Sequence, residues 1–379
     1  MAIRVLIVDD SALMRALLTQ IVSAAPDIEV VGAAPDPLAA REMIKSLNPD
    51  VLTLDIEMPR MDGLEFLSRL MRLRPMPVVM ISSYTARGSD IALQALEIGA
   101  FDFQGKPEAN NLATLEAYSD EICDKIRAAY QARERIARTF APGQAVNRAG
   151  NGQLKSTTTA EVARPGLRMK PTTENSQESK IGARILANHV IAIGASTGGT
   201  EAIKEVLIRL PATMPPIVIV QHMPESFTLS FAKRLDSLSA LNVIEAQGGE
   251  RLAAGTAYLA PGHSHLQIKK SGSGYVTELN RREPVNRHRP SVDVLFDSVA
   301  KECGQHATAV ILTGMGKDGA KGMLNMRQAG AWTIGQDETS CVVYGMPREA
   351  AMLGAVAEVV TLRDIASRLL AHLQRLDHA

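Results

Sequence analysis

The sequence predicts an α/β protein made of two doubly wound domains, each with a mostly parallel sheet. Short β-branched runs alternate with stretches in which apolar residues recur at helical spacing, and this rhythm is typical of βα units. A polar stretch near the middle of the chain separates two blocks that both show the rhythm. With 379 residues, the chain is long enough for two domains that each bury a core.

The first block contains five predicted strands. They are expected at residues 3–8, 28–34, 50–54, 77–82 and 100–103. Helical patterns lie between them, and the first is the clearest because Leu13, Leu17 and Ile21 repeat on one face. Five βα units therefore account for about the first third of the chain.

The polar stretch at residues 141–180 has no aromatic residue and only five large aliphatic ones. So little apolar surface cannot offset the entropy lost on ordering the chain, and a flexible linker is the prediction. We therefore expect a first domain at 1–127, a helical extension with the linker at 128–184, and a second domain at 185–379.

The second block repeats the βα rhythm. Its clear strands are expected at 189–194, 216–221 and 308–313, with weaker ones at 242–246 and 256–260. The last stretch, residues 362–376, has the pattern of an amphipathic helix.

Charge and cysteine content exclude several classes of protein. Lys+Arg and Asp+Glu are 41 each, which argues against a generic binder of nucleic acid or of membrane surfaces. The first block has 12 basic and 19 acidic residues, and residues 181–379 have 20 and 18. The three cysteines form no CxxC pair, so we expect a reducing, cytoplasmic location without a disulfide framework. Neither a signal peptide nor a membrane-spanning run is recognisable.

Three carboxylates follow predicted strands of the first block. Asp9 and Asp10 follow one strand and Asp55 follows another, and the carboxyl ends of parallel strands meet in one crevice. Oxygen ligands of this kind suit Mg²⁺. Lys106 and Ser82 follow or end two further strands and can contact a phosphoryl group there. Capping of the following helices is the alternative for each aspartate taken singly.

The first block resembles the receiver domain of two-component response regulators, a flavodoxin-like fold. The motifs VDDSALMR, LDIEMPRMDGLEFL, ISS and GKP carry this resemblance over residues 2–127. It implies that a histidine kinase phosphorylates Asp55. The resemblance also implies that Asp9, Asp10 and Asp55 bind Mg²⁺ and that Lys106 contacts the phosphate. It implies that Ser82 and Phe103 are the hydroxyl and aromatic switch positions.

In the second block, Gly194–Gly198 fits G-x-S-x-G between a predicted strand and a predicted helix. Small residues permit a sharp turn that exposes the hydroxyl of Ser196, and the helix N-terminus presents free N–H groups to negative charge. An anion-binding loop and a purely structural turn are the alternatives.

A serine nucleophile needs a base, and His222 follows the strand at 216–221. Asp318 lies in a glycine-rich turn after the strand at 308–313, so three strand ends offer Ser, His and Asp to one crevice. The backbone N–H groups of 314–316 are candidate oxyanion donors. The chain order Ser…His…Asp differs from that of the α/β-hydrolases.

The second block is similar to the catalytic domain of the chemotaxis receptor methylesterases, the CheB family. The motifs are GASTGG, QHMPESFT, APGHSH, EPVNRHRPSVD, LTGMGKDGAKG and VVYGMP. The resemblance implies a Rossmann-like domain that hydrolyses glutamyl methyl esters on chemoreceptors and deamidates certain glutamines, without a cofactor for the esterase. It implies Ser196 as nucleophile, His222 as base, Asp318 as its orienting partner and the Met315 N–H as oxyanion donor.

The same resemblance implies chemoreceptors as substrates and the histidine kinase CheA as phosphodonor, and we expect a monomeric enzyme. A tethered receiver can cover the crevice, and phosphorylation of Asp55 would then favour an open state. Three alternatives stay open: action on another ester or amide, a DNA-binding regulator using the arginines of 281–289, and a nucleotide-binding adaptor using 194–199.

Overall fold

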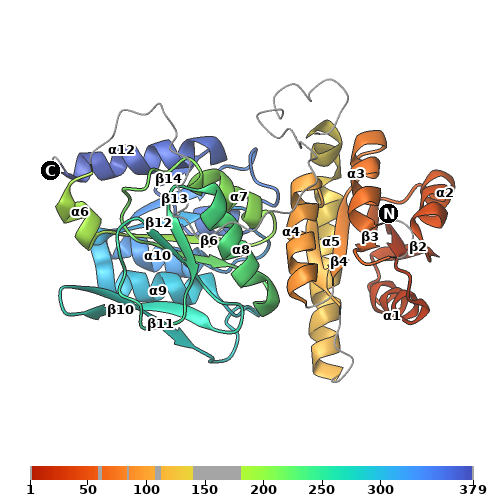
Figure 1. Cartoon of the computed structure of the whole chain (residues 1–379), viewed down its shortest axis with the longest axis horizontal. Helices are drawn as coiled ribbons and strands as arrows, with labels where there is room; N and C mark the ends of the chain where they lie inside the picture. Colours follow the sequence, from red (N-terminus) through yellow and green to blue (C-terminus); the bar gives the residue numbers. More distant parts are fainter. Residues whose placement is uncertain (1, 59–61, 83–84, 107–111, 140–180, 378–379) are drawn as a thin grey trace, which may run out of the picture.

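The computed structural model describes residues 2–58, 62–82, 85–106, 112–139 and 181–377. The predicted linker at 141–180 lies outside these described residues. Two α/β domains lie side by side, with the amino-terminal domain at the right and the carboxyl-terminal domain at the left of Figure 1.

The first domain has five parallel strands in the order β2-β1-β3-β4-β5. This is the flavodoxin-like order expected from the resemblance. Its elements are β1 (Ile3–Val8), α1 (Ala12–Ser23), β2 (Ile28–Ala34), α2 (Pro37–Leu47), β3 (Val51–Asp55), α3 (Gly63–Leu73), β4 (Val78–Ser82), α4 (Ala86–Ile98), β5 (Asp102–Gly105) and α5 (Leu112–Thr139). All five predicted strands are present, and β5 begins two residues later than the apolar run suggested.

Helix α5 is one continuous helix of 28 residues. It runs past residue 127, the expected end of the first domain, and its further turns include the buried Ala128, Ala129 and Ala132, which belong to the same core cluster. The helical extension expected after the receiver is thus the second half of the domain's own last helix.

The second domain has seven parallel strands in the order β14-β13-β12-β6-β7-β9-β8. Its elements are α6 (Ala183–Asn188), β6 (Val190–Ala195), α7 (Gly199–Leu207), β7 (Ile217–Gln221), α8 (Glu225–Leu238), β8 (Asn242–Glu245), β9 (Thr256–Leu259), β10 (His265–Ser271), β11 (Gly274–Asn280), α9 (Val292–Cys303), η2 (Gly304–His306), β12 (Ala307–Ile311), α10 (Ala320–Gln328), β13 (Trp332–Gln336), α11 (Met346–Met352), β14 (Glu358–Val360), η3 (Leu362–Asp364) and α12 (Ile365–Asp377).

The weaker predicted strands are present as β8 and β9. Four strands were not predicted: the antiparallel hairpin β10–β11, outside the main sheet, the edge strand β14, and β13, which lies between β14 and β12. Half of β10 is exposed and polar, and β14 has three residues. The exposed or short strands lack the buried apolar run from which the others were recognised. Strand β13 is mostly buried, but its large apolar residues are only Trp332 and Ile334.

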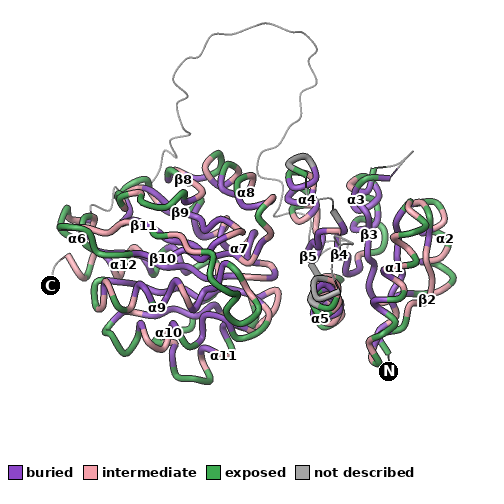
Figure 2. Tube along the Cα trace, turned by 90° about the horizontal axis from the view of Figure 1, so that it is seen from below, coloured by how far each residue is buried: buried purple, intermediate pink, exposed green. Residues whose placement is uncertain are grey.

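Buried strands run through the middle of each domain with helices on both sides (Figure 2). All residues of β6, β7 and β12 are buried, as expected for parallel strands covered on both faces. Strand β6 lies between β12 and β7, and the strand order reverses there. A doubly wound sheet opens its crevice at this switch point, at the carboxyl ends of these three strands.

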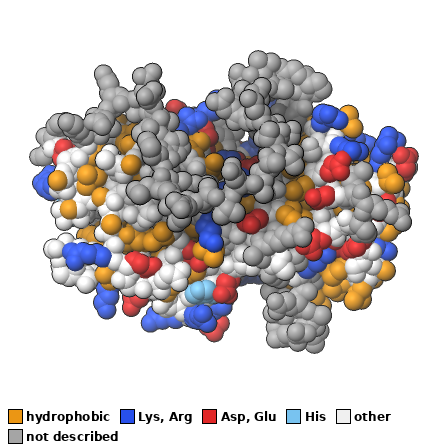
Figure 3. All heavy atoms as spheres, in the orientation of Figure 1, with side chains coloured by type: hydrophobic (Ala, Val, Ile, Leu, Met, Phe, Trp, Pro, Cys, Tyr) orange, Lys and Arg blue, Asp and Glu red, His pale blue; other side chains and the backbone are white. Residues whose placement is uncertain are grey.

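Charged side chains of both signs are mixed over the face drawn in Figure 3, and the described residues form no continuous basic surface there. Among the described helices, none is long and apolar enough to cross a membrane.

Candidate active site at the switch point of the second sheet

Ser196 directly follows β6 at the switch point. The chain turns there through Gly198, which has a φ of +77°, a conformation that favours glycine. A Cβ on Gly199 would come within 2.1 Å of the Gln221 side chain. The small residues of GASTGG are therefore required by the turn that brings Ser196 to the edge of the sheet and starts α7.

His222 follows β7, the neighbour of β6. Ala195 pairs with Gln221 in the register of the two strands, and the His222 N–H donates to the Ala195 carbonyl at 3.1 Å. The Gln221 amide donates to the carbonyl of Ser196 at 2.9 Å. Ser196 and His222 are thus the first residues beyond two paired strand ends, so their backbones are adjacent, while no hydrogen bond joins their side chains among the described residues.

Asp318 completes the group. Its Oδ2 lies 2.8 Å from His222 Nε2, and the two side chains are 1% and 7% exposed. Burial alone would raise the pKa of Asp318, but hydrogen bonds from His222, Asn286 and Ser291 hold this pKa well below its usual range. The carboxylate therefore stays ionised and fixes the orientation of the imidazole.

His222 turns its Nε2 towards the carboxylate, so Nδ1 is the ring nitrogen left for the serine. Nδ1 is buried and has no hydrogen-bond partner among the described residues. A buried polar atom without a partner is costly and is common where a reacting group has to bind. Its placement beside the end of β6 suits a base for the Ser196 hydroxyl.

The turn after β12 approaches the serine closely. A Cβ on Gly314 would come within 2.8 Å of the Ser196 Cβ. The Gly314 N–H is already donated to the Val343 carbonyl at 3.1 Å, so the expectation that it serves as an oxyanion donor was wrong. No acceptor for the Met315 N–H is found among the described residues, which agrees with the expected donor at that position.

In the first domain, Asp9, Asp10 and Asp55 converge at the carboxyl ends of β1 and β3. One carboxylate oxygen from each lies within 4.8 Å of the others. The helix-capping interpretation was wrong, because Ser11 caps α1 and Asp62 caps α3. Asp9 Oδ2 is buried and has no hydrogen-bond partner among the described residues. Three convergent carboxylates fit a hard divalent cation such as Mg²⁺. The nearest cationic group to Asp9 Oδ2 among the described residues is Lys106 Nζ, 3.6 Å away and beyond hydrogen-bond distance.

Lys106 lies at the same edge, as predicted. Its Nζ is 2.9 Å from Asp55 Oδ2 and 3.6 Å from Asp9 Oδ2. Burial raises the pKa of Asp55 to about 6, although the hydrogen bond from Lys106 opposes this change. A cation beside these carboxylates would lower this pKa again and favour the ionised form.

The two predicted switch positions lie on neighbouring strands. Ser82 is the last residue of β4, and its backbone pairs with Gly105. Phe103 is buried, and its ring stacks on Phe227 of α8 with 4.4 Å between centroids. The expected aromatic switch position therefore lies in the contact between the two domains.

Three residues beside the triad were not singled out from the sequence. Asn286 and Ser291 donate to Asp318 Oδ1 at 2.7 and 2.8 Å, and the His288 ring stacks on the His222 ring at 3.7 Å between centroids. All three fall in EPVNRHRPSVD, a loop without the periodicity of a helix or strand. The signal available was the density of polar residues immediately before α9.

The first domain contacts the residues around the serine. Thr197 donates its hydroxyl to Asp102 Oδ2 at 2.9 Å, and both side chains are buried. Met315 packs against the apolar cluster that contains the buried residues of α5. The Arg135 guanidinium of α5 donates to the Val342 carbonyl. In this arrangement the first domain borders both the nucleophile turn and the oxyanion turn.

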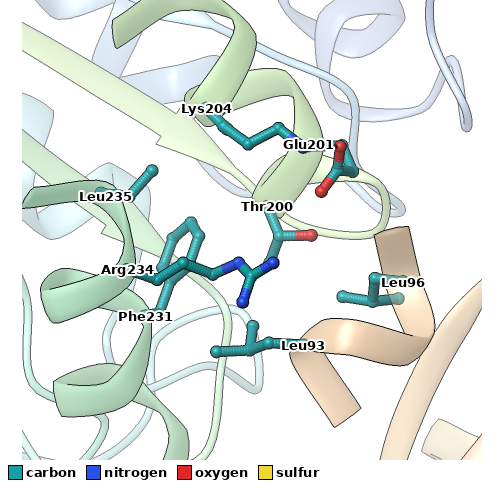
Figure 4. Close-up of a pocket in the computed structure, with 8 residues that line it drawn as sticks. All are labelled: Leu93, Leu96, Thr200, Glu201, Lys204, Phe231, Arg234 and Leu235. Atoms are coloured by element: carbon teal, nitrogen blue, oxygen red, sulfur yellow. Dashed lines mark hydrogen bonds and ion pairs between the residues drawn. The ribbon is translucent and has the colours of Figure 1, made fainter. Parts of the chain in front are cut away.

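A small hollow lies in the same interface and is drawn in Figure 4. It is lined by two residues of α4 and by residues of α7 and α8: Leu93, Leu96, Thr200, Glu201, Lys204, Phe231, Arg234 and Leu235. Glu97 at its edge pairs with Lys204 at 3.7 Å and with Arg234. None of the triad residues lines this hollow, so it belongs to the domain contact and not to the crevice.

The two domains define a class of protein, a response regulator whose output domain has the side-chain arrangement of a serine hydrolase. Residues 5–116 match the family model of the response regulator receiver domain, and residues 191–369 match that of the CheB methylesterase. The chain belongs to the CheB methylesterase family.

Several named proteins are similar to the chain over nearly its whole length. A protein-glutamate methylesterase/protein-glutamine glutaminase 1 of Dechloromonas aromatica is 59% identical, with 97% of each chain covered. A protein-glutamate methylesterase/protein-glutamine glutaminase of Nitrosomonas europaea is 57% identical, covering 98% of this chain and 96% of that one. The solved catalytic domain of Thermotoga maritima CheB methylesterase is 40% identical, with a TM-score of 0.48, covering 49% of this chain and 99% of that one.

Proposed function

We propose that the chain is a phosphorylation-activated methylesterase that hydrolyses glutamyl methyl esters of chemoreceptors and deamidates specific glutamines. The observation that carries this proposal is the convergence of Ser196, His222 and Asp318 on three adjoining strand ends, with the 2.8 Å contact between the histidine and the carboxylate. Family membership supports the substrate class, because full-length relatives are named protein-glutamate methylesterase/protein-glutamine glutaminase.

The proposed chemistry is acyl transfer. The Ser196 Oγ attacks the ester carbonyl carbon while His222 Nδ1 takes its proton, and Asp318 stabilises the imidazolium that forms. The Met315 N–H donates to the oxyanion. The imidazolium then protonates the departing methoxide, and methanol leaves. Water, deprotonated by the same histidine, attacks the acyl-enzyme and releases the glutamate. With a glutamine substrate, the leaving group is ammonia.

In the receiver, Asp55 is the proposed phosphorylation site, with the histidine kinase CheA as donor. Asp9, Asp10 and Asp55 would hold Mg²⁺, which neutralises charge on the transferred phosphoryl group. Lys106 already bonds to Asp55 and would contact the phosphoryl oxygens. Ser82 at the end of β4 would supply a hydroxyl to the same group.

We further propose that the unphosphorylated receiver restricts access to the crevice. The contacts of Asp102 with Thr197 and of the α5 cluster with Met315 support this arrangement. Phosphorylation at Asp55 would favour the separated state, since a ligand or modification shifts an equilibrium towards the state in which it is better accommodated. The cytoplasmic location and the monomeric state expected from the sequence stay predictions.

Methanol release from methylated chemoreceptor membranes tests both parts. We expect stimulation by a small phosphodonor with Mg²⁺, loss of release in Ser196→Ala and loss of stimulation alone in Asp55→Asn. Activity of Ser196→Ala near that of the wild type would refute the nucleophile. Removing residues 1–140 should raise basal activity, and a fragment less active than the unphosphorylated parent would contradict occlusion.

A further inference from the structure

The segment Asn286–His288 contacts both the base and the carboxylate of the triad. His288 lies with its ring nearly parallel to that of His222, at an interplanar angle of 13° and a centroid distance of 3.7 Å. Two residues earlier, the Asn286 amide donates to Asp318 Oδ1 at 2.7 Å. One short segment therefore contacts both partners of the His222–Asp318 hydrogen bond from outside the bond itself.

The backbone of this segment is fixed in an uncommon shape. Asn286 and Arg287 have φ values of +53° and +69°, a region that non-glycine residues seldom adopt. Val285 and His288 exchange backbone hydrogen bonds at 2.9 and 3.0 Å across the two residues. This tight turn places the Asn286 amide and the His288 ring on the triad at the same time. Strain of this kind persists where the surrounding contacts determine the conformation, and it is frequent at functional sites.

The Asn286 amide also joins two carboxylates. It donates to Asp293 Oδ2 as well as to Asp318 Oδ1, each at 2.7 Å. Asp293 in turn accepts from the Gly322 N–H at 2.6 Å. With both of its hydrogens used, the amide has one orientation, and Asp318 is held between this amide, the Ser291 hydroxyl and the N-terminus of α9.

The surroundings of His288 suit a neutral ring that packs against His222, and not a second general base. No side-chain hydrogen bond of His288, and so no direct one to Ser196, is found among the described residues. Burial, and then the neighbouring His222, lower the pKa of His288 to about 3. The ring is therefore neutral at physiological pH. A neutral ring can stay stacked when His222 takes up a proton, whereas a second imidazolium at 3.7 Å would repel it.

We propose that Asn286 and His288 are positioning residues of the esterase: the stacked ring sets the plane of the His222 imidazole, and the amide sets the Asp318 carboxylate that bonds to it. The inference rests on the proposed triad. It goes beyond the triad because it assigns the orientation of His222 and Asp318 to the turn before α9. It also states that His288 acts through its stacked ring and transfers no proton.

Steady-state kinetics of the full-length chain test the proposal. Phosphodonor and Mg²⁺ are present so that the contact with the receiver does not limit the rate. His288→Ala should lower kcat about 10- to 100-fold with KM little changed, the cost expected for a slightly misplaced base. His288→Phe keeps a flat ring and should retain most of the wild-type kcat with a pH–rate profile of the same shape. Asn286→Asp keeps a residue type that tolerates the turn but removes the amide donor, and it should lower kcat in the same way.

A second measurement does not depend on turnover. The proton shared by His222 and Asp318 should give a low-field ¹H resonance in the wild type. We expect the resonance to persist in His288→Phe and to broaden or vanish in His288→Ala. His306→Ala is the matched histidine control, because His306 is exposed and lies just before β12, at the opposite end of that strand. It should change neither kcat nor the resonance.

Each result bears on the proposal. Unchanged kcat and an unchanged resonance in His288→Ala would overturn the positioning role. A His288→Phe variant as impaired as His288→Ala, with an altered pH profile, would also overturn it and would make His288 a proton carrier. If His288→Ala fails to fold, Asn286→Asp and the resonance of His288→Phe decide. Ser196→Ala in the same series separates failure of the positioning role from failure of the triad. An active Ser196→Ala variant would refute the triad itself.

Discussion

The hydrogen bond between Thr197 and Asp102 offers a direct test of closure by the receiver. Thr197 follows the proposed nucleophile, and its hydroxyl donates to Asp102 Oδ2 at 2.9 Å. The two residues are 4% and 9% exposed in this arrangement. In Asp102→Ala the hydroxyl would have no acceptor while the domains touch, but water would satisfy it once they separate. Within the receiver, Asp102 also accepts from the Phe103 N–H at 2.8 Å and lies 4.0 Å from Lys125 Nζ, and these contacts are lost in both states. The part of the effect that is specific to the closed state is therefore the lost contact with Thr197.

The magnitude follows from the type of bond. A hydrogen bond to a charged group contributes about 1.5–3 kcal/mol. Since about 1.4 kcal/mol corresponds to a factor of ten, the ratio of closed to open molecules should fall about 10- to 150-fold. If the closed state is inactive and dominates, the basal rate rises by the same factor until most molecules are open. Phosphorylation then has correspondingly less to add.

The assay is methanol release without phosphodonor, in the presence of a chelator. Glu65→Ala is the matched control, because it also removes a receiver carboxylate, but one that pairs within α3 with Arg69. Thermal unfolding of both variants reports whether the receiver stays folded. A basal rate for Asp102→Ala equal to that of Glu65→Ala, in a folded protein, would refute closure through this contact.

Three further predictions concern the second domain. Asp318→Asn should lower kcat by roughly 10³- to 10⁴-fold, because the imidazole loses the partner that fixes its orientation; retention of activity would remove Asp318 from the triad. Gly314→Ala should lower both activity and melting temperature, since the new Cβ would lie 2.8 Å from the Ser196 Cβ; a folded and fully active variant would contradict the close approach. Burial lowers the pKa of His189 from 6.5 to about 3. The free energy of unfolding therefore has its full value above pH 6.5 and falls as the pH drops towards 3, by up to about 1.4 kcal/mol per pH unit. Urea unfolding between pH 7 and pH 4 should therefore show a shallower loss for His189→Gln, and parallel curves for the two proteins would refute the assignment.

Much of the fold could be predicted because buried parallel strands consist of continuous runs of apolar residues in the sequence. The five receiver strands and β6, β7 and β12 were recognised in this way. The same reasoning placed Ser196, His222 and Asp318 at strand ends, and the strand order then determined that these ends are adjacent. Sequence reasoning was weakest where a strand is short, exposed or outside the main sheet, as in the hairpin β10–β11.

The part of the site that was missed depends on tertiary contact. Asn286 and His288 have no periodicity, and only the left-handed turn between Val285 and His288 brings them to the triad. The donors of the oxyanion turn at 314–316 also depend on contacts with distant residues. Glycine content suggested every N–H of 314–316 as a donor, yet the pairing of Gly314 with Val343 removes one of them. Local sequence identifies a turn, but the partners of its backbone groups come from distant segments.

The path from Asp55 to the crevice is short. Lys106 bonds to Asp55 and lies one residue beyond β5, the strand that also holds Asp102 and Phe103. A phosphoryl group on Asp55 would draw Lys106 towards new oxygens, and any shift of the end of β5 would be transmitted to the contacts of Asp102 and Phe103 with the second domain. Those contacts lie within four residues of the lysine, so we expect the coupling to run through the end of β5.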